Sequence, residues 1–144
     1  MSLNVDLSER LTVLLDLEKG FLTVEGEETA VRGIRRTLIE MRDVLYDEHL
    51  ETHDSDIAYC VFRRVASIQD LPLFDRLGLR YDLTVLPPGN WGGEYPKTFG
   101  HLHEQAPTSA SEVFEVVRGE AHFLIQDTIK KGEVEIIEAG EGEK

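Results

Sequence analysis

The stretch Gly100-His101-Leu102-His103, followed after eight residues by Glu112 and after six more by Gly119, carries the most information in this sequence. Residues two apart in a β-strand point to the same face, so His101 and His103 would present two imidazoles to one side. If the chain turns back through residues 104–111, Glu112 reaches the neighbouring antiparallel strand. Two imidazoles and a carboxylate suit Fe(II), Mn(II), Ni(II) or Zn(II) better than Mg or Ca. The stretch therefore predicts a divalent-metal site.

An isolated His-x-His pair is most often a chance pair on an exposed strand. Here a glycine precedes the pair, a glutamate follows at hairpin distance, and a turn glycine comes after the glutamate. These additions favour metal ligation. A carboxylate beside a divalent cation stays ionised near neutral pH, so Glu112 can serve as a ligand, as a base or as both.

The rest of the sequence predicts many short strands and little helix. Two apolar runs separated by Gly20, 11–15 and 21–24, predict two edge strands or a strand and an irregular arm. Between Thr29 and Tyr46, apolar residues recur at three- and four-residue steps, which predicts a helix, either from Thr29 as its N-cap or, because Gly33 disfavours helix, over the second half of the segment alone. Further strands are predicted at 57–65, 79–86, 98–103, 113–118, 121–126 and 134–137. Gly119-Glu120 and Lys131-Gly132 mark tight turns, and the pattern indicates an all-β sandwich or barrel.

Composition limits the class of protein. The chain has 144 residues, of which 41% are hydrophobic and 30% charged, as expected for one soluble domain. Its net charge of −13 argues against nucleic-acid binding, although backbone N–H groups, hydroxyls and a metal can still hold a phosphate locally. No apolar run approaches the roughly 20 residues that a membrane helix needs. We see no secretory signal, and Cys60 is the only cysteine, so a cytoplasmic location is expected.

Three blocks of this sequence resemble the archaeal, cupin-type glucose-6-phosphate isomerases. The most specific is Lys97-Thr98-Phe99-Gly100-His101-Leu102-His103. The others are Tyr81-Asp82-Leu83-Thr84-Val85-Leu86-Pro87-Pro88-Gly89 and Glu112-Val113-Phe114-Glu115-Val116-Val117-Arg118-Gly119. The spacer before Glu112 has eight residues where the family usually has six, and a hairpin loop absorbs two residues at little entropic cost. Phe114 stands where the family usually has tyrosine, so any role for a hydroxyl there is lost.

The resemblance implies a cupin-type double-stranded β-helix, or jelly-roll barrel, with a minor N-terminal helical segment. We expect one structural domain, with an N-terminal arm and short helix over residues 1–55 and the barrel portion over residues 56–144. The family's fourth metal ligand, a later histidine, is absent from this chain. We therefore expect it beyond Lys144, with the barrel incomplete at its C-terminal end.

The resemblance also implies an activity, the interconversion of glucose 6-phosphate and fructose 6-phosphate by a homodimer. By position, His101, His103 and Glu112 bind one divalent metal per subunit, Fe(II) first and Mn, Ni or Zn as alternatives. Glu112 is also the catalytic base. Thr84, Thr98 and Gly100 match positions that contact the phosphate of the substrate. The partners expected are the sugar phosphate and a second subunit, with no nucleic acid and no membrane.

Two other functions remain open. Two histidines and a carboxylate also suit a non-haem iron dioxygenase, against which the Lys-Thr-x-Gly block argues. A non-catalytic, sugar-binding cupin is the other alternative. Lys97 is the only basic residue between Tyr81 and Val117, and it is expected either to lie in solvent or to steer the phosphate.

Overall fold

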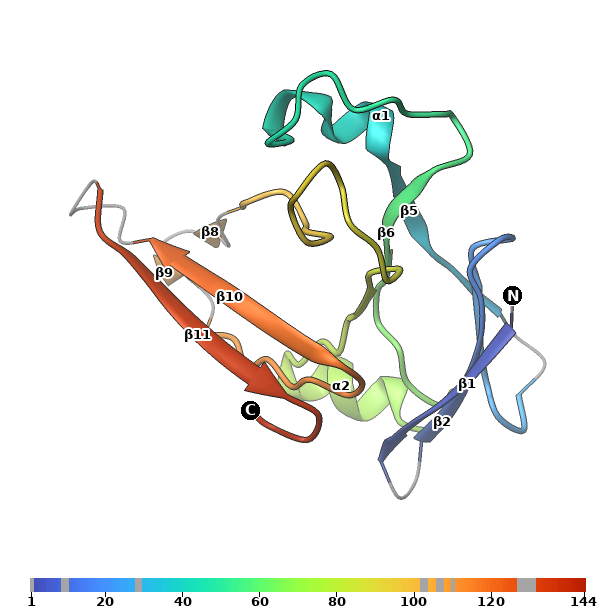
Figure 1. The fold of residues 1–144 in the computed structure, drawn as a ribbon. Coiled ribbons are helices and arrows are strands. Elements are labelled where there is room, and N and C mark those ends of the chain that lie inside the picture. Colours follow the sequence, from blue (N-terminus) through green and yellow to red (C-terminus); the bar gives the residue numbers. More distant parts are fainter. Residues whose placement is uncertain are drawn as a thin grey trace. The chain divides into compact units, whose positions relative to one another are not determined.

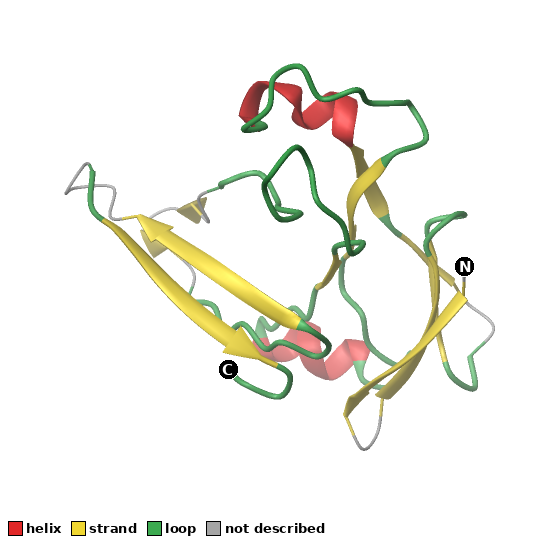
Figure 2. Cartoon of the chain, in the orientation of Figure 1, coloured by secondary structure: helices red, strands yellow, loops and turns green. Residues whose placement is uncertain are grey.

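The structure, a computed structural model, describes residues 2–8, 11–27, 30–101, 104–105, 108–109, 111–126 and 132–144. The chain divides into two compact units, Met1–His101 and Leu102–Lys144. Strands dominate the described residues, and Figure 2 shows that the helices are few and short. This content confirms the all-β class predicted from the sequence.

The first unit begins with a four-stranded antiparallel sheet in the order β1-β2-β3-β4. Val13 and Leu15 are buried whereas Leu14 between them is 46% exposed, which is the two-residue alternation of a strand with one face on a core. The two predicted strands are present as β2 and β3, but neither is an edge strand because β1 and β4 flank them. The four strands are β1 (Ser2–Ser8), β2 (Leu11–Asp16), β3 (Phe21–Val24) and β4 (Ala30–Arg32).

A three-stranded sheet follows, with β6 (Ile57–Phe62) between β5 (Ile34–Thr37) and β7 (Leu83–Val85). Figure 1 shows β5 running beside β6 and leading directly into α1. The predicted domain boundary between residues 55 and 56 falls between β5 and β6 of this sheet. The sequence prediction of a strand at 57–65 is confirmed over the length of β6.

Of the helix predicted between Thr29 and Tyr46, only the second half is helical, which is the shorter of the two predicted extents; the first half forms β4 and β5. Gly33 explains the difference, because a Cβ there would lie 2.4 Å from Cys60 Sγ. The glycine thus lets the chain approach β6 closely enough to pair as a strand. Helix begins only afterwards, in α1 (Leu38–Met41) and the 3-10 turn η1 (Arg42–Val44).

Thr37 is the N-cap of α1, whereas Thr29, the predicted cap, lies outside the described residues. The Thr37 side chain accepts a hydrogen bond from Glu40 N, and the Glu40 carboxylate accepts one from Thr37 N at 2.8 Å. This reciprocal capping box starts the helix at the end of β5. The side chains of Leu38 and Met41 then enter a buried cluster with Ala58, Tyr59 and Trp91.

The strand predicted at 79–86 is shorter than expected, because residues 79–82 connect the end of a helix to β7 without regular secondary structure. Helix α2 (Leu71–Leu77) ends at Gly78, whose φ of +64° is the left-handed conformation that glycine adopts easily. Leu79 N then donates to Phe74 O at 3.0 Å and completes the end of the helix. Only the last part of the predicted strand remains, as β7.

The second unit contains two hairpins. One joins β8 (Glu104–Gln105) to β9 (Thr108–Ser109), and the other joins β10 (Glu120–Gln126) to β11 (Val134–Gly140). The predicted strands at 121–126 and 134–137 are confirmed and lengthened. Within each hairpin the strands pair antiparallel.

The strand predicted at 113–118 is absent, since residues 111–117 have no regular secondary structure. Val116 pairs instead with the turn that follows β11: its N–H donates to Glu143 O at 3.0 Å, and its carbonyl accepts from Gly142 N at 2.7 Å. The Val116 side chain is 5% exposed. The Gly119-Glu120 turn, with Gly119 at φ +86°, therefore follows an irregular segment rather than a strand.

The strand predicted at 98–103 is also absent over residues 98–101, and residues 102–103 lie outside the described part. Across the residues that the structure describes, the strands form four separate antiparallel sheets and do not close into a barrel. None of the helices among those residues has both the length and the apolar character needed to span a membrane.

Candidate active site

The loop before the Lys-Thr-x-Gly-His block is anchored by Trp91. Its side chain is 7% exposed and packs in the cluster of Leu38, Met41, Ala58 and Tyr59. Its backbone forms an isolated antiparallel bridge with Glu94, with Trp91 N donating to Glu94 O at 2.9 Å. The two glycines between them have positive φ, which closes the turn. This packing fixes where the following segment starts.

Glu94 and Lys97 tie the same loop to the end of η1. The Glu94 carboxylate accepts a hydrogen bond from Tyr46 N at 2.8 Å and forms an ion pair with Lys97 Nζ. Lys97 Nζ also donates to the Val44 carbonyl. Lys97 therefore holds the loop in place, a role that the sequence analysis did not anticipate.

Phe99 fixes the segment that carries the predicted phosphate contacts. Its side chain packs against the buried cluster, and the guanidinium of Arg36 lies over its ring, 5.6 Å from the centroid. Thr98, on one side, is half-buried, and Gly100, on the other, is exposed with no atom within 4 Å of a Cβ built there. The backbone at Gly100 is thus approachable, which a phosphate site requires.

His101 is the last residue of the first unit. A backbone carbonyl group orients its imidazole ring. Its Nδ1 lies 3.2 Å from the carbonyl oxygen of Phe99. Because a carbonyl only accepts hydrogen bonds, this contact requires the proton on Nδ1. Metal-binding histidines are commonly oriented by such a carbonyl, with Nε2 as the donor atom to the metal. The orientation of His101 therefore fits the ligand role predicted for it.

Thr84 lies in the middle of β7, where it pairs with Val61 of β6 and its side chain is exposed. The predicted phosphate contacts Thr84, Thr98 and Gly100 thus belong to one unit, together with His101. They lie on two segments connected by the Trp91 loop.

The other two predicted ligands are placed differently. His103 lies outside the described residues, and Glu112 is exposed in the second unit, in the irregular segment after β9. The chain does turn back over residues 104–109, because Glu104 pairs with Ser109 and Gln105 with Thr108, but Glu112 does not lie on the neighbouring strand that was predicted for it. Searched over the described residues, the structure holds no group of three metal-ligating side chains. By donor chemistry, two imidazoles and a carboxylate fit a borderline-hard divalent cation.

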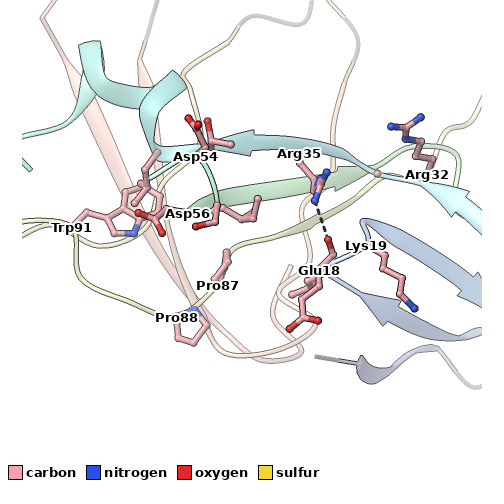
Figure 3. Close-up of a pocket in the computed structure, with 15 residues that line it drawn as sticks. Glu18, Lys19, Arg32, Arg35, Asp54, Asp56, Pro87, Pro88 and Trp91 are labelled. Atoms are coloured by element: carbon pink, nitrogen blue, oxygen red, sulfur yellow. Dashed lines mark hydrogen bonds between the residues drawn. The ribbon is translucent and has the colours of Figure 1, made fainter. Parts of the chain in front are cut away.

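An open pocket of about 920 Å³ in the first unit was not anticipated from the sequence. Figure 3 shows Trp91 and Asp56 on one side of it and Arg35 with Glu18 on the other. Arg35 Nη1 donates to the Glu18 carbonyl oxygen at 2.9 Å across this end. None of the predicted ligands or phosphate contacts lines the pocket.

Sequence reasoning missed Arg36 and Phe99. Tyr59, 9% exposed, forms a side-chain hydrogen bond with Arg36 that is the largest cause of the raised pKa of the guanidinium. Glu40 Oε1 accepts a second bond from Arg36 Nη1 at 3.2 Å. The only sequence signal for Arg36 was its position in the Arg35-Arg36 pair. That pair distinguishes the two arginines only once β5 is known to be a strand, because a strand turns neighbouring side chains to opposite faces.

Small antiparallel sheets with few, short helices make this an all-β protein. The family model "Glucose-6-phosphate isomerase (GPI)" matches residues 35–144. The chain belongs to this family, the archaeal-type cupin family of glucose-6-phosphate isomerases. No curated protein and no solved structure gives a significant match.

Proposed function

We propose that the chain is a metal-dependent aldose–ketose isomerase that interconverts glucose 6-phosphate and fructose 6-phosphate. Family membership supports the reaction. The proposal further includes a cupin-type barrel, a homodimer, and one divalent metal per subunit, Fe(II) first, held by His101, His103 and Glu112. Glu112 is proposed as both ligand and base.

The pairing of β8 with β9 is the observation that carries the assignment of Glu112. In this hairpin, Glu104 is opposite Ser109. The chain therefore reverses direction over residues 104–109, between the two histidines and Glu112 in the sequence. A reversal of this kind is what a ligand set drawn from both segments requires.

The phosphate is proposed to bind through the hydroxyls of Thr84 and Thr98 and the backbone N–H of Gly100. Phe99 packing and the Glu94–Lys97 clamp support this choice, because both restrain the segment without occupying the space at Gly100. A restrained segment loses little entropy when it binds a ligand. Phosphate binding would hold the sugar's reacting carbons at a fixed place.

Glu112 is proposed to remove a proton from one of the carbons C1 and C2 and return it to the other through an enediol. A carboxylate can do this when it lies within hydrogen-bond reach of the proton that it moves. The bound metal would supply positive charge that stabilises negative charge developing on the sugar oxygens. A hydride shift is the competing route, and it would not need Glu112 as a base.

The test is the substitution Glu112→Gln, which keeps the shape of the side chain and removes its basicity. We expect isomerase activity to be abolished, with the circular dichroism spectrum unchanged. The matched control is Glu115→Gln, a carboxylate in the same segment that pairs with Lys144 at 3.5 Å. Control activity should stay close to wild type. Full activity in Glu112→Gln would remove this residue from the mechanism.

A further inference from the structure

A single guanidinium is held against the segment between the two phosphate-contacting positions. Phe99 lies between Thr98 and Gly100 in the sequence, and the Arg36 guanidinium lies over its ring, 5.6 Å from the ring centroid. The nearest lysine in sequence, Lys97, is paired with Glu94 and the Val44 carbonyl, whereas Arg36, although paired with Glu40, has five N–H donors and keeps more of them for a further acceptor. In a chain with a net charge of −13, a local cation close to the proposed cradle would strengthen phosphate binding.

The surroundings of Arg36 hold its guanidinium in one orientation. Glu40 accepts from Nη1 on one side, and Tyr59 is hydrogen-bonded on another. The Glu40 carboxylate is itself fixed by Thr37, through the backbone N–H and the hydroxyl. Among the described residues, the buried Nε atom has no hydrogen-bond partner, while the side chain keeps 39% of its surface exposed. A guanidinium that is restrained in one orientation and partly exposed is preorganised to bind an anion.

We propose that Arg36 is a further substrate-recognition residue, supplying the positive charge that selects the phosphorylated end of the sugar at the Thr98–Gly100 segment. This inference rests on the proposed function and adds a specificity residue to it. Arg35 provides the contrast within the same strand. It is exposed, donates to the Glu18 carbonyl, and points to the pocket of Figure 3 rather than to Phe99.

The experiment measures the dissociation constants of inorganic phosphate and glucose 6-phosphate by titration calorimetry on the full chain. Loss of one charge-assisted contact should weaken both about tenfold or more in Arg36→Met. Arg36→Lys keeps the charge and should lose about threefold. The matched control Arg35→Met should bind as tightly as wild type. Phe99→Leu removes the ring under the guanidinium and should weaken phosphate binding several-fold, which provides a test if Arg36→Met does not fold.

The outcomes separate this inference from the proposed function. Equal affinities in Arg36→Met, Arg35→Met and wild type would overturn the role of Arg36 and leave the isomerase proposal standing. Equal losses in Arg36→Met and Arg36→Lys would show that shape rather than charge matters, which also overturns it. Failure of the wild-type chain to bind either ligand would contradict both proposals.

Discussion

At the residue scale, Glu40 joins the start of α1 to the site. One oxygen of its carboxylate accepts bonds from the N–H and hydroxyl of Thr37, and the other accepts from Arg36. The backbone hydrogen bond from Thr37 is the largest cause that lowers the pKa of Glu40 from its usual value. The charged carboxylate is therefore stabilised by folding.

This predicts how the stability of the chain depends on pH. A lowered pKa in the folded state means that the contribution is present above the unfolded pKa, near 4.3, and is lost as pH falls through the lower folded value. Glu40→Gln should reduce the free energy of unfolding by about 0.5–1 kcal/mol at pH 7. The difference from wild type should shrink as the pH is lowered below 4. Urea denaturation at a series of pH values measures both effects.

The control for this prediction is Glu51→Gln, which neutralises an exposed carboxylate outside the capping box. We expect its stability to follow wild type at each pH. A constant difference between Glu40→Gln and wild type from pH 7 to pH 3 would contradict the coupling between Glu40 ionisation and the cap.

Individual site residues could be proposed from the sequence only where a motif marked them. The segment 97–103 pointed to Thr98, Gly100 and His101, and the structure adds the contacts that orient His101. The contact between Arg36 and Phe99 was not predicted, because it joins β5 to a loop more than sixty residues later in the chain. Residue spacing within a short segment cannot indicate such a tertiary contact.

At the element scale, predictions succeeded where alternation and turn residues agreed. β2, β3, β6, β10 and β11 were all recognised from apolar runs bounded by turns. The helix predicted from Thr29 forms only over its second half. The apolar steps of the first half fit two short strands equally well, and Gly33, where a Cβ would meet Cys60, favours the strands. The strand predicted at 113–118 failed because Val116 pairs with the turn after β11.

The β8–β9 hairpin and the proposed metal site together yield a prediction about the separation of residues 101 and 112. If both are ligands of one cation, cysteines at these two positions come close enough for a disulfide, which joins Cα atoms about 4–7 Å apart. The double variant His101→Cys/Glu112→Cys, in a Cys60→Ala background, should therefore form an intrachain disulfide on mild oxidation. Peptide mass spectrometry of the oxidised chain, compared with the reduced chain, detects the crosslinked pair.

The matched control moves one cysteine away from the proposed ligand position. His101→Cys/Glu115→Cys places the second thiol three residues further along the chain, at a position whose carboxylate pairs with Lys144 and belongs to no proposed ligand set. Crosslinking should be much slower in this variant. Equal rates in the two double variants would show that residues 101 and 112 are not held close to one another.

At the scale of the whole molecule, the all-β class could be predicted from the sequence, but the way the sheets are arranged could not. Antiparallel strands in small sheets follow from alternating apolar residues and frequent turns. Closure of those sheets depends on contacts between segments far apart in the chain, and periodicity carries no information about them. The division into Met1–His101 and Leu102–Lys144 likewise follows from the contacts made within each unit.

The proposed ligands come from both units, with His101 in the first and Glu112 in the second. A cation bound by both should stabilise the folded chain by mass action, by about 2.7 kcal/mol at a free metal concentration of 100 times Kd. We therefore predict that Mn(II) raises the thermal unfolding midpoint by several degrees and that a chelator reverses the shift. Differential scanning calorimetry measures this without any need for activity.

Substitutions of the proposed ligands distinguish this effect from non-specific metal binding to an acidic surface. His101→Asn and Glu112→Gln should each abolish most of the shift, because each removes a ligand from the proposed set. His122→Asn is the control, since His122 lies 4.0 Å from Glu138 on the β10–β11 hairpin and belongs to no proposed site. Its shift should match wild type. A shift of the same size in all four proteins would mean that the cation binds to the chain's carboxylates at large, and the proposed metal site would have to be abandoned.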